Sequence, residues 1–136
     1  MRLLAWLALL SLPATAALAL PPAAPPTGGL ILAVPGSWLA GFATPVAVGL
    51  QGLPLTLANE DIMKHNVVAV ELGPPDSPWC FHFPDDQCPL FWSRTVNFGE
   101  VAAVEGLAAL APLTAYHYYC EEHPAMEGVL VVVPGA

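Results

Sequence analysis

The chain has 136 residues, 56% of them hydrophobic, and a formal net charge of −8, because three basic residues oppose eleven acidic ones. This length suffices for one domain with a buried core. Nucleic acid binding is excluded as a function class, since phosphate recognition needs a basic surface that three Lys and Arg residues cannot form.

The first 19 residues have the pattern of a secretory signal peptide. Met1 and Arg2 precede an apolar stretch of about ten residues, and a run of small residues follows up to Ala19. We expect cleavage after Ala19, or alternatively after Ala16, and hence a periplasmic or extracellular protein. An uncleaved membrane anchor remains open, because residues 3–20 just reach the length of a spanning helix.

The rest of the chain is predicted to be a linker followed by one all-β domain. Residues 20–29 are too rich in Pro and Gly to form a regular element. In residues 30–136, short apolar or alternating runs are separated by Gly, Pro, Asn and Asp, a pattern typical of a sandwich or barrel. The predicted strands are residues 30–34, 45–50, 54–58, 65–72, 89–93, 100–104, 114–120 and 128–133. Residues 106–113 are too short a run for a stable helix.

Four residues between the end of the third predicted strand and the start of the fourth could carry chemistry. The pair Glu60 and Asp61 has no accompanying base or nucleophile, so we expect a solvated turn rather than carboxylate catalysis. We expect Met63 to pack in the core or in the loop. His65 is different, because it opens the fourth predicted strand, where the sheet would hold a ligand in place.

Three cysteines occur in the chain, and in an exported protein cysteines tend to pair. Cys80 and Cys88 flank a short loop that a disulfide could close. His82 lies inside that loop and is expected to be a surface or packing residue. Cys120 is then left over, and three roles are open for it: a metal ligand, a buried free thiol, or a bridge to one of the other two cysteines.

Near the C-terminus a thiol, an imidazole and a thioether occur together, at Cys120, His123 and Met126. Cys and Met are soft ligands that favour copper, and a trigonal His₂Cys site with a weak axial Met is the coordination of a blue electron-transfer centre. His65 is the candidate for the second imidazole. His117 is not, because strand alternation directs it away from the side on which Cys120 lies.

These ligand stretches resemble the cupredoxin family. The matching segments run from Gly52 through Asn59 to Met63-Lys64-His65-Asn66-Val67, and over Tyr116-x-Tyr118-x-Cys120-x-x-His123-Pro124-x-Met126-x-Gly128. The two-residue gap on each side of His123 is most similar to amicyanin, within the amicyanin and plastocyanin-like group. The matching motifs span about residues 46–70 and 99–133, whereas the extra cysteine pair and the Pro-rich loop between them depart from the family pattern.

The resemblance implies a Greek-key β-sandwich of about seven to eight strands that binds one type 1 copper ion, cycling between Cu(I) and Cu(II). The implied ligands are His65, Cys120, His123 and Met126. It also implies that Asn66 ties the two ligand loops together by hydrogen bonds near the thiolate. His123 would be the electron exit, in an apolar surface patch with Pro124 and Ala125, and with Trp38, Leu39 and Phe42 as possible neighbours.

We therefore expect a secreted or periplasmic blue copper protein that shuttles single electrons, not an enzyme. A copper enzyme of the nitrite reductase or multicopper oxidase kind would need a second copper centre, usually with His-x-His pairs, and the sequence has none. A copper carrier or storage protein with the same ligands is the alternative function.

The acidic balance favours a transient, basic redox partner, such as a c-type cytochrome or a membrane oxidase. Glu121, Glu122 and Glu127 lie beside the ligands, where they serve either to steer such a partner or simply to keep the protein soluble. We expect a monomer, with membrane contact only if the N-terminal segment stays uncleaved.

Overall fold

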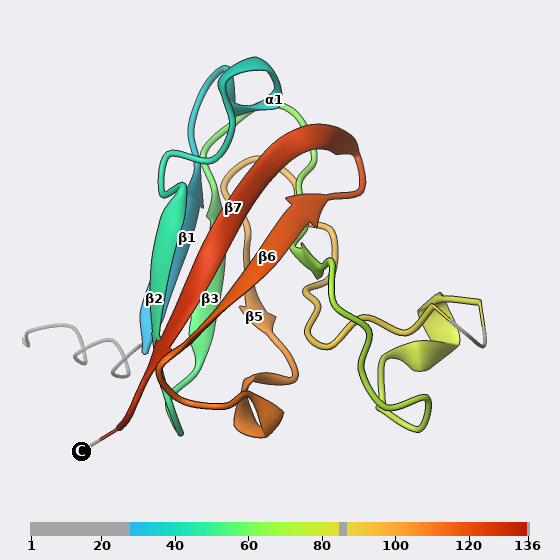
Figure 1. Cartoon of the computed structure of the whole chain (residues 1–136). Helices are drawn as coiled ribbons and strands as arrows, with labels where there is room; N and C mark the ends of the chain where they lie inside the picture. Colours follow the sequence, from blue (N-terminus) through green and yellow to red (C-terminus); the bar gives the residue numbers. More distant parts are fainter. Residues whose placement is uncertain (1–27, 85–86, 136) are drawn as a thin grey trace, which may run out of the picture.

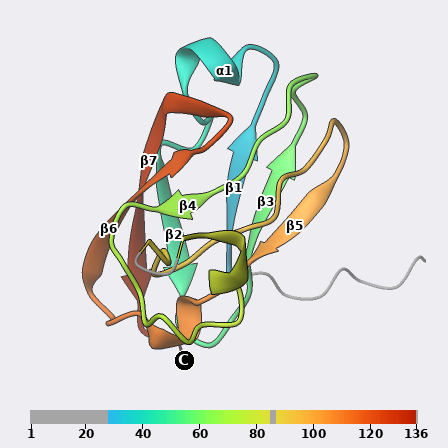
Figure 2. The same cartoon turned by 90° about the vertical axis from the view of Figure 1, so that its right-hand side faces the viewer.

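Two β-sheets form the body of the molecule in the computed structural model, which describes residues 28–84 and 87–135 (Figures 1 and 2). The predicted signal peptide and residues 20–27 of the predicted linker lie outside the described residues. One sheet has the strand order β1-β3-β5, with β1 (Gly29–Ala33), β3 (Leu55–Asn59) and β5 (Val101–Val104). The other has the order β2-β7-β6-β4, with β2 (Val46–Leu50), β7 (His123–Val133), β6 (Thr114–Cys120) and β4 (Val68–Ala69).

Both sheets are mixed. The pairs β1–β3 and β2–β7 are parallel, whereas β3–β5, β4–β6 and β6–β7 are antiparallel. Three short helical segments join the strands, namely α1 (Ser37–Ala40) and the 3₁₀ turns η1 (Cys80–His82) and η2 (Leu107–Ala109). None of the helices in the described part of the chain is long and apolar enough to cross a membrane.

The core lies between the two sheets and is built by alternation along the strands. Successive side chains of a strand point to opposite faces, so every second residue can be buried. In β3 the buried set includes Leu55 and Leu57, and in β7 it includes Leu130 and Val132. Apolar burial of this kind supplies most of the driving force for folding.

The all-β prediction is confirmed, and six of the eight predicted strands are found within a few residues of their expected bounds. The predicted strand over residues 65–72 is reduced to β4, and that over 89–93 forms only isolated bridges, such as Trp92 with Val68 and with Glu105. The intervening segment contains several prolines, which lack the backbone N–H that a sheet ladder needs. Pairing in this region is therefore interrupted.

The segment between β4 and β5 carries the predicted disulfide. Cys80 and Cys88 are bonded to each other, with an S–S distance of 2.01 Å. His82 is exposed and stacks on the ring of Trp92, with 4.7 Å between ring centroids, so the prediction of a surface or packing histidine is confirmed. The loop protrudes from the sandwich beyond β4, on the right in Figure 1.

Candidate metal centre

His65 is held by backbone pairing rather than by a regular strand. Its N–H donates to the carbonyl of Val96 at 3.1 Å, and the N–H of Val96 donates to the carbonyl of His65 at 2.8 Å. The His65 side chain is completely buried. The expectation that a sheet would anchor this residue is thus met by one isolated bridge, which fixes the backbone from which the imidazole projects.

Cys120 and His123 lie at the two sides of a tight turn. Cys120 is the last residue of β6 and His123 the first of β7, and they face each other across the strand pair. The strand predicted over residues 128–133 begins earlier than expected, because β7 starts at His123 and includes Met126. A pairing irregularity at Tyr119 and Cys120 marks where the ladder adjusts to the turn.

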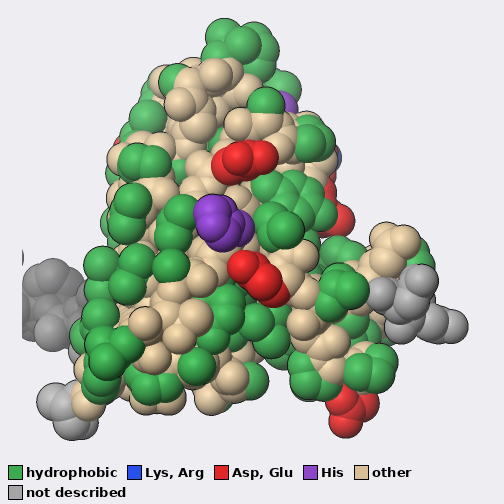
Figure 3. Space-filling view, viewed as in Figure 1, with side chains coloured by type: hydrophobic (Ala, Val, Ile, Leu, Met, Phe, Trp, Pro, Cys, Tyr) green, Lys and Arg blue, Asp and Glu red, His purple; other side chains and the backbone are tan. Residues whose placement is uncertain are grey.

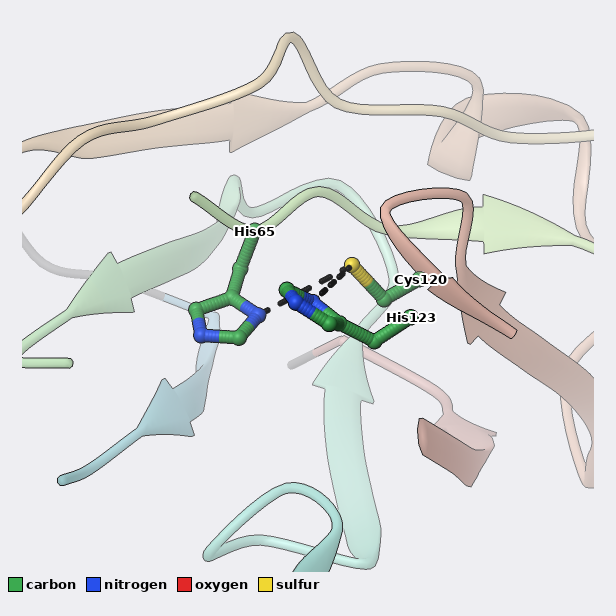
Figure 4. Close-up of side chains that lie close together, drawn as sticks. All are labelled: His65, Cys120 and His123. Atoms are coloured by element: carbon green, nitrogen blue, oxygen red, sulfur yellow. Dashed lines mark hydrogen bonds between the residues drawn. The ribbon is translucent and has the colours of Figure 1, made fainter. Parts of the chain in front are cut away.

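Three potential ligand atoms converge at this end of the sandwich (Figure 4). The Sγ of Cys120 lies 3.8 Å from Nδ1 of His65 and 3.9 Å from Nδ1 of His123. For a first-row metal bound about 2.3 Å from a sulfur and about 2.0 Å from a nitrogen, a trigonal angle places the sulfur and the nitrogen about 3.7 Å apart. The spacing therefore fits a small metal ion between the three atoms.

The donor chemistry fits copper. Two imidazole nitrogens and one cysteine sulfur are the trigonal donor set of blue copper sites, for which a methionine is the usual weak fourth donor. Met126 is 1% exposed and belongs to the same buried cluster as Cys120. Cys120 is a free cysteine, so it is available as a ligand and the alternative of a bridge to another cysteine is wrong.

The predicted solvated turn is wrong for Asp61. It is buried, not in a solvated turn, and its Oδ2 lies 3.1 Å from Nε2 of His65. Desolvation acts to raise the pKa of Asp61, but the hydrogen bonds from His65 and from the backbone N–H of Met63 outweigh it, so the pKa of Asp61 is lowered. The pKa of His65 is also lowered, in this case because burial disfavours the charged imidazolium. The pair is therefore an ionised carboxylate and a neutral imidazole that donates from Nε2.

This pairing leaves Nδ1 of His65 without a proton and directed at Cys120. A carboxylate behind a ligating histidine fixes the ring orientation and its tautomer, as outer groups do in many metal sites. The four-residue separation of Asp61 and His65 was the only hint in the sequence, and it is a weak one outside a helix.

Asn66 ties the two ligand segments together, as the resemblance implied. Its side chain donates to Glu121 at 2.6 Å and accepts from the backbone N–H of Glu121 at 2.9 Å. Its backbone N–H also donates to Sγ of Cys120 at 3.4 Å. Burial raises the pKa of the Cys120 thiol, and this backbone hydrogen bond opposes that shift because it favours the thiolate.

The surface beside the centre is partly apolar. His123 is half-buried and lines a hollow of about 400 Å³ together with Ile62, Met63, Lys64 and Glu122. Ile62 is 82% exposed and Met63 is 40% exposed. Of the two expected positions for Met63, the core and the loop, the structure therefore shows the loop.

The other sequence candidates can also be placed. Trp38 and Leu39 are exposed on α1, but Phe42 is buried and is not available to a surface patch. His117 is exposed, as strand alternation predicted, and lies outside the group of converging ligand atoms.

Comparison with solved structures identifies the architecture. The chain is similar to a purple cupredoxin from Nitrosopumilus maritimus, with 20% sequence identity, a TM-score of 0.55, and coverage of 76% of this chain and 97% of that chain. The chain has the cupredoxin fold. A reduced Cu(I) form of an amicyanin mutant matches with 19% identity and a TM-score of 0.54, over 81% of this chain and 86% of that one.

A second amicyanin mutant in its Cu(I) form gives a TM-score of 0.53 at 18% identity, again over 81% of this chain and 86% of that chain. No family model and no curated protein matches the sequence. The cupredoxin fold predicted from the two ligand stretches is therefore confirmed at the level of architecture, with the converging His65, Cys120 and His123 at one end of the sandwich.

Proposed function

We propose that this chain is an exported type 1 copper protein that carries single electrons, with His65, Cys120, His123 and Met126 as its ligands. The observation that carries the proposal is the approach of two Nδ1 atoms to within 3.8 and 3.9 Å of one buried, free cysteine sulfur. When bound, copper would supply a one-electron couple. The residues around the copper would hold and orient its ligands.

The residues around the proposed copper site restrict the movement of its ligands. Asp61 orients His65 from behind, and Asn66 joins the His65 segment to the turn that follows Cys120. Because β6 and β7 pair directly at Cys120 and His123, the backbone at these two proposed ligands has little freedom to move when a metal binds. A rigid site changes little when an electron is gained or lost, and this is the requirement for rapid transfer.

His123 is the proposed electron exit, because it is half-buried beside the apolar side chains of Ile62 and Met63. The proposed partner is a basic redox protein, such as a c-type cytochrome or a membrane oxidase, in the periplasm or outside the cell. The net charge of −8 would steer such a partner, and the small exposed apolar area favours brief contact.

The visible spectrum of the copper-loaded protein tests this proposal. We expect an intense thiolate-to-Cu(II) band that disappears on reduction and returns on reoxidation. Cys120→Ser should abolish the band without unfolding the protein, because the hydroxyl is a poor replacement for the thiolate. His117→Gln is the matched control and should leave the band unchanged, since His117 is exposed on the opposite side of the same strand.

Two results would contradict the proposal. A Cys120→Ser variant with an unchanged band would exclude the thiolate as a ligand. Loss of copper in each redox cycle would instead favour the alternative function, a copper carrier or storage protein that uses the same residues and must release its metal.

A further inference from the structure

The loop closed by the disulfide carries aromatic side chains that the proposed copper site does not use. This segment departs from the cupredoxin pattern in the sequence, and it protrudes beyond β4 in Figure 1. Together with Trp92 and the residue that follows β5, it encloses a hollow of about 190 Å³. We call this the aromatic hollow, and its lining residues are Pro78, Trp79, Phe81, His82, Trp92 and Glu105.

Two tryptophans lie beside Glu105 in this hollow. Trp92 and Glu105 exchange two backbone hydrogen bonds, of 3.1 and 2.7 Å, so their side chains project from the same side of the pair. Trp79 is oriented by its indole Nε1, which donates to the carbonyl of Pro89 at 2.9 Å. A Cβ added at Gly106 would lie only 2.9 Å from the Trp79 ring, so this ring packs directly on the backbone next to Glu105.

The disulfide loop supplies the remaining wall. The bond between Cys80 and Cys88 closes the loop, and η1 carries Phe81 and His82. The His82 ring stacks on Trp92 with 4.7 Å between ring centroids, and the Phe81 ring lies 3.8 Å from that of His82. The loop thus brings further rings against the tryptophan that pairs with Glu105.

Glu105 gives the aromatic hollow a negative charge that the described part of the chain does not neutralise. Its carboxylate forms no ion pair with a described residue, because the two basic side chains there are placed elsewhere. Arg94 pairs with Glu100 at 3.3 Å, and Lys64 lines the hollow beside His123. The charge at Glu105 is therefore available to a cation from outside the chain.

Aromatic rings combined with one carboxylate select an organic cation. Cations are attracted to the faces of Trp and Phe rings, and quaternary ammonium groups are the ligands best known for this interaction. The hollow is smaller than the about 300 to 1,000 Å³ of pockets that hold drug-sized ligands, so only a small group fits. An ammonium with N–H groups would need acceptors that ring and proline carbons do not offer, whereas a quaternary ammonium has no N–H to satisfy.

We propose that the aromatic hollow binds the quaternary ammonium group of a small organic cation, with Glu105 as its counter-charge. The loop over residues 73–89 contains no Lys or Arg that would repel such a ligand, and Figure 3 shows its visible face, at the right, as largely hydrophobic. None of the lining residues is a proposed copper ligand. Binding therefore does not depend on the proposed electron-transfer function.

Tetramethylammonium chloride is the probe, and the indole N–H signals in NMR spectra of the purified protein follow its binding. We expect the Trp79 and Trp92 signals to shift along one saturating curve, with a dissociation constant of about 1 to 10 mM. The signal of Trp38, on α1, is the internal control and should not follow that curve. Sodium chloride at equal concentration corrects for ionic strength. The neutral analogue tert-butanol should bind at least about fivefold more weakly.

Two matched pairs of variants locate the site. Glu105→Gln should raise the dissociation constant by about three- to tenfold, whereas Glu127→Gln removes the same charge from an exposed position on β7 and should change it less. Phe81→Leu keeps an apolar side chain but removes the ring, and should raise the constant by about two- to fivefold. Phe98→Leu is its control, because Phe98 is also exposed and does not line the hollow.

Three results would overturn the proposal. The first is the absence of a saturating shift at up to about 100 mM probe. The second is equal binding of tert-butanol, which would show that the hollow selects only for apolar groups. The third is an equal effect of the two variants within either pair. Since no readout involves copper, each of these results would leave the proposed electron-transfer function standing.

Discussion

The carboxylate of Asp61 decides which ring nitrogen of His65 faces the sulfur of Cys120 without a proton. Because it is ionised and accepts a hydrogen bond from Nε2, Nδ1 is left as a free donor atom 3.8 Å from the sulfur of Cys120. Asp61→Asn presents an amide group that can favour the other tautomer. We expect metal affinity to fall by about 10- to 100-fold, the usual effect of removing such an outer partner.

Competition with a chelator, followed in the visible spectrum, measures this affinity. Glu60→Gln is the matched control, because it removes one negative charge at the preceding, exposed position. Equal affinities of the two variants would show that Asp61 acts only through the total charge of the loop. A thermal scan of each metal-free variant separates a loss of affinity from a loss of folding.

Among the structural elements, the β6–β7 hairpin positions most of the centre. Gly128 faces Tyr118 across the hairpin, and a Cβ at this position would overlap the tyrosine ring. That ring is buried, and its hydroxyl donates to the carbonyl of Thr44 at 3.0 Å, so it cannot move aside freely. Gly128→Ala should destabilise the protein by about 1 to 3 kcal/mol, as overpacking in a dense core does.

Chemical denaturation of the metal-free protein measures the change. Gly49→Ala on β2 is the matched control, because its new Cβ would meet only the end of the Leu130 side chain, at 3.1 Å. Since Tyr118 is two residues from Cys120, Gly128→Ala should also broaden the copper band. An equal loss of stability in both variants would place the effect in the general cost of filling a sheet glycine.

The elements could be predicted from the sequence where local pattern determines structure. The alternating run over 114–120 gave β6 with its observed bounds, and the clustering of Cys120, His123 and Met126 gave the metal end of the sandwich. The segment after His65 could not be predicted in this way, because its apolar run suggests a full strand, whereas only Val68 and Ala69 form a ladder and the neighbouring pairings are isolated bridges. Helix α1 is too short for its period to be visible.

Asp61 and the shared outer face of β2 and β7 were missed for a different reason. The burial of Asp61 depends on how a turn folds back on the His65 ring, and adjacent residues in the sequence give no sign of this. The shared face arises only when β2 pairs with β7, two segments about 80 residues apart in the chain. Residue type can be read locally, whereas a shared face depends on the topology of the sheet.

Over the whole molecule, the uneven distribution of charge separates two kinds of surface. Strand β2 carries no charged side chain, whereas Glu121 and Glu122 are exposed in the turn between Cys120 and His123. Negative charges concentrated near the proposed electron exit attract cationic reagents and repel anionic ones. The same carboxylates could instead serve only solubility, and the two roles differ in how electron-transfer rates respond to salt.

Stopped-flow oxidation of the reduced copper protein by small cationic and anionic metal complexes distinguishes these roles. The rate with the cationic oxidant should fall as salt rises, and the rate with the anionic oxidant should increase, because the screening length shrinks to about 10 Å at 0.1 M.

Glu122→Gln should reduce the salt dependence, since Glu122 lines the hollow beside His123. Glu105→Gln removes the same charge from a different hollow, beside Trp92, and should change the rates less. If the two variants respond equally, the turn carboxylates have no local role, and only the net charge steers the partner.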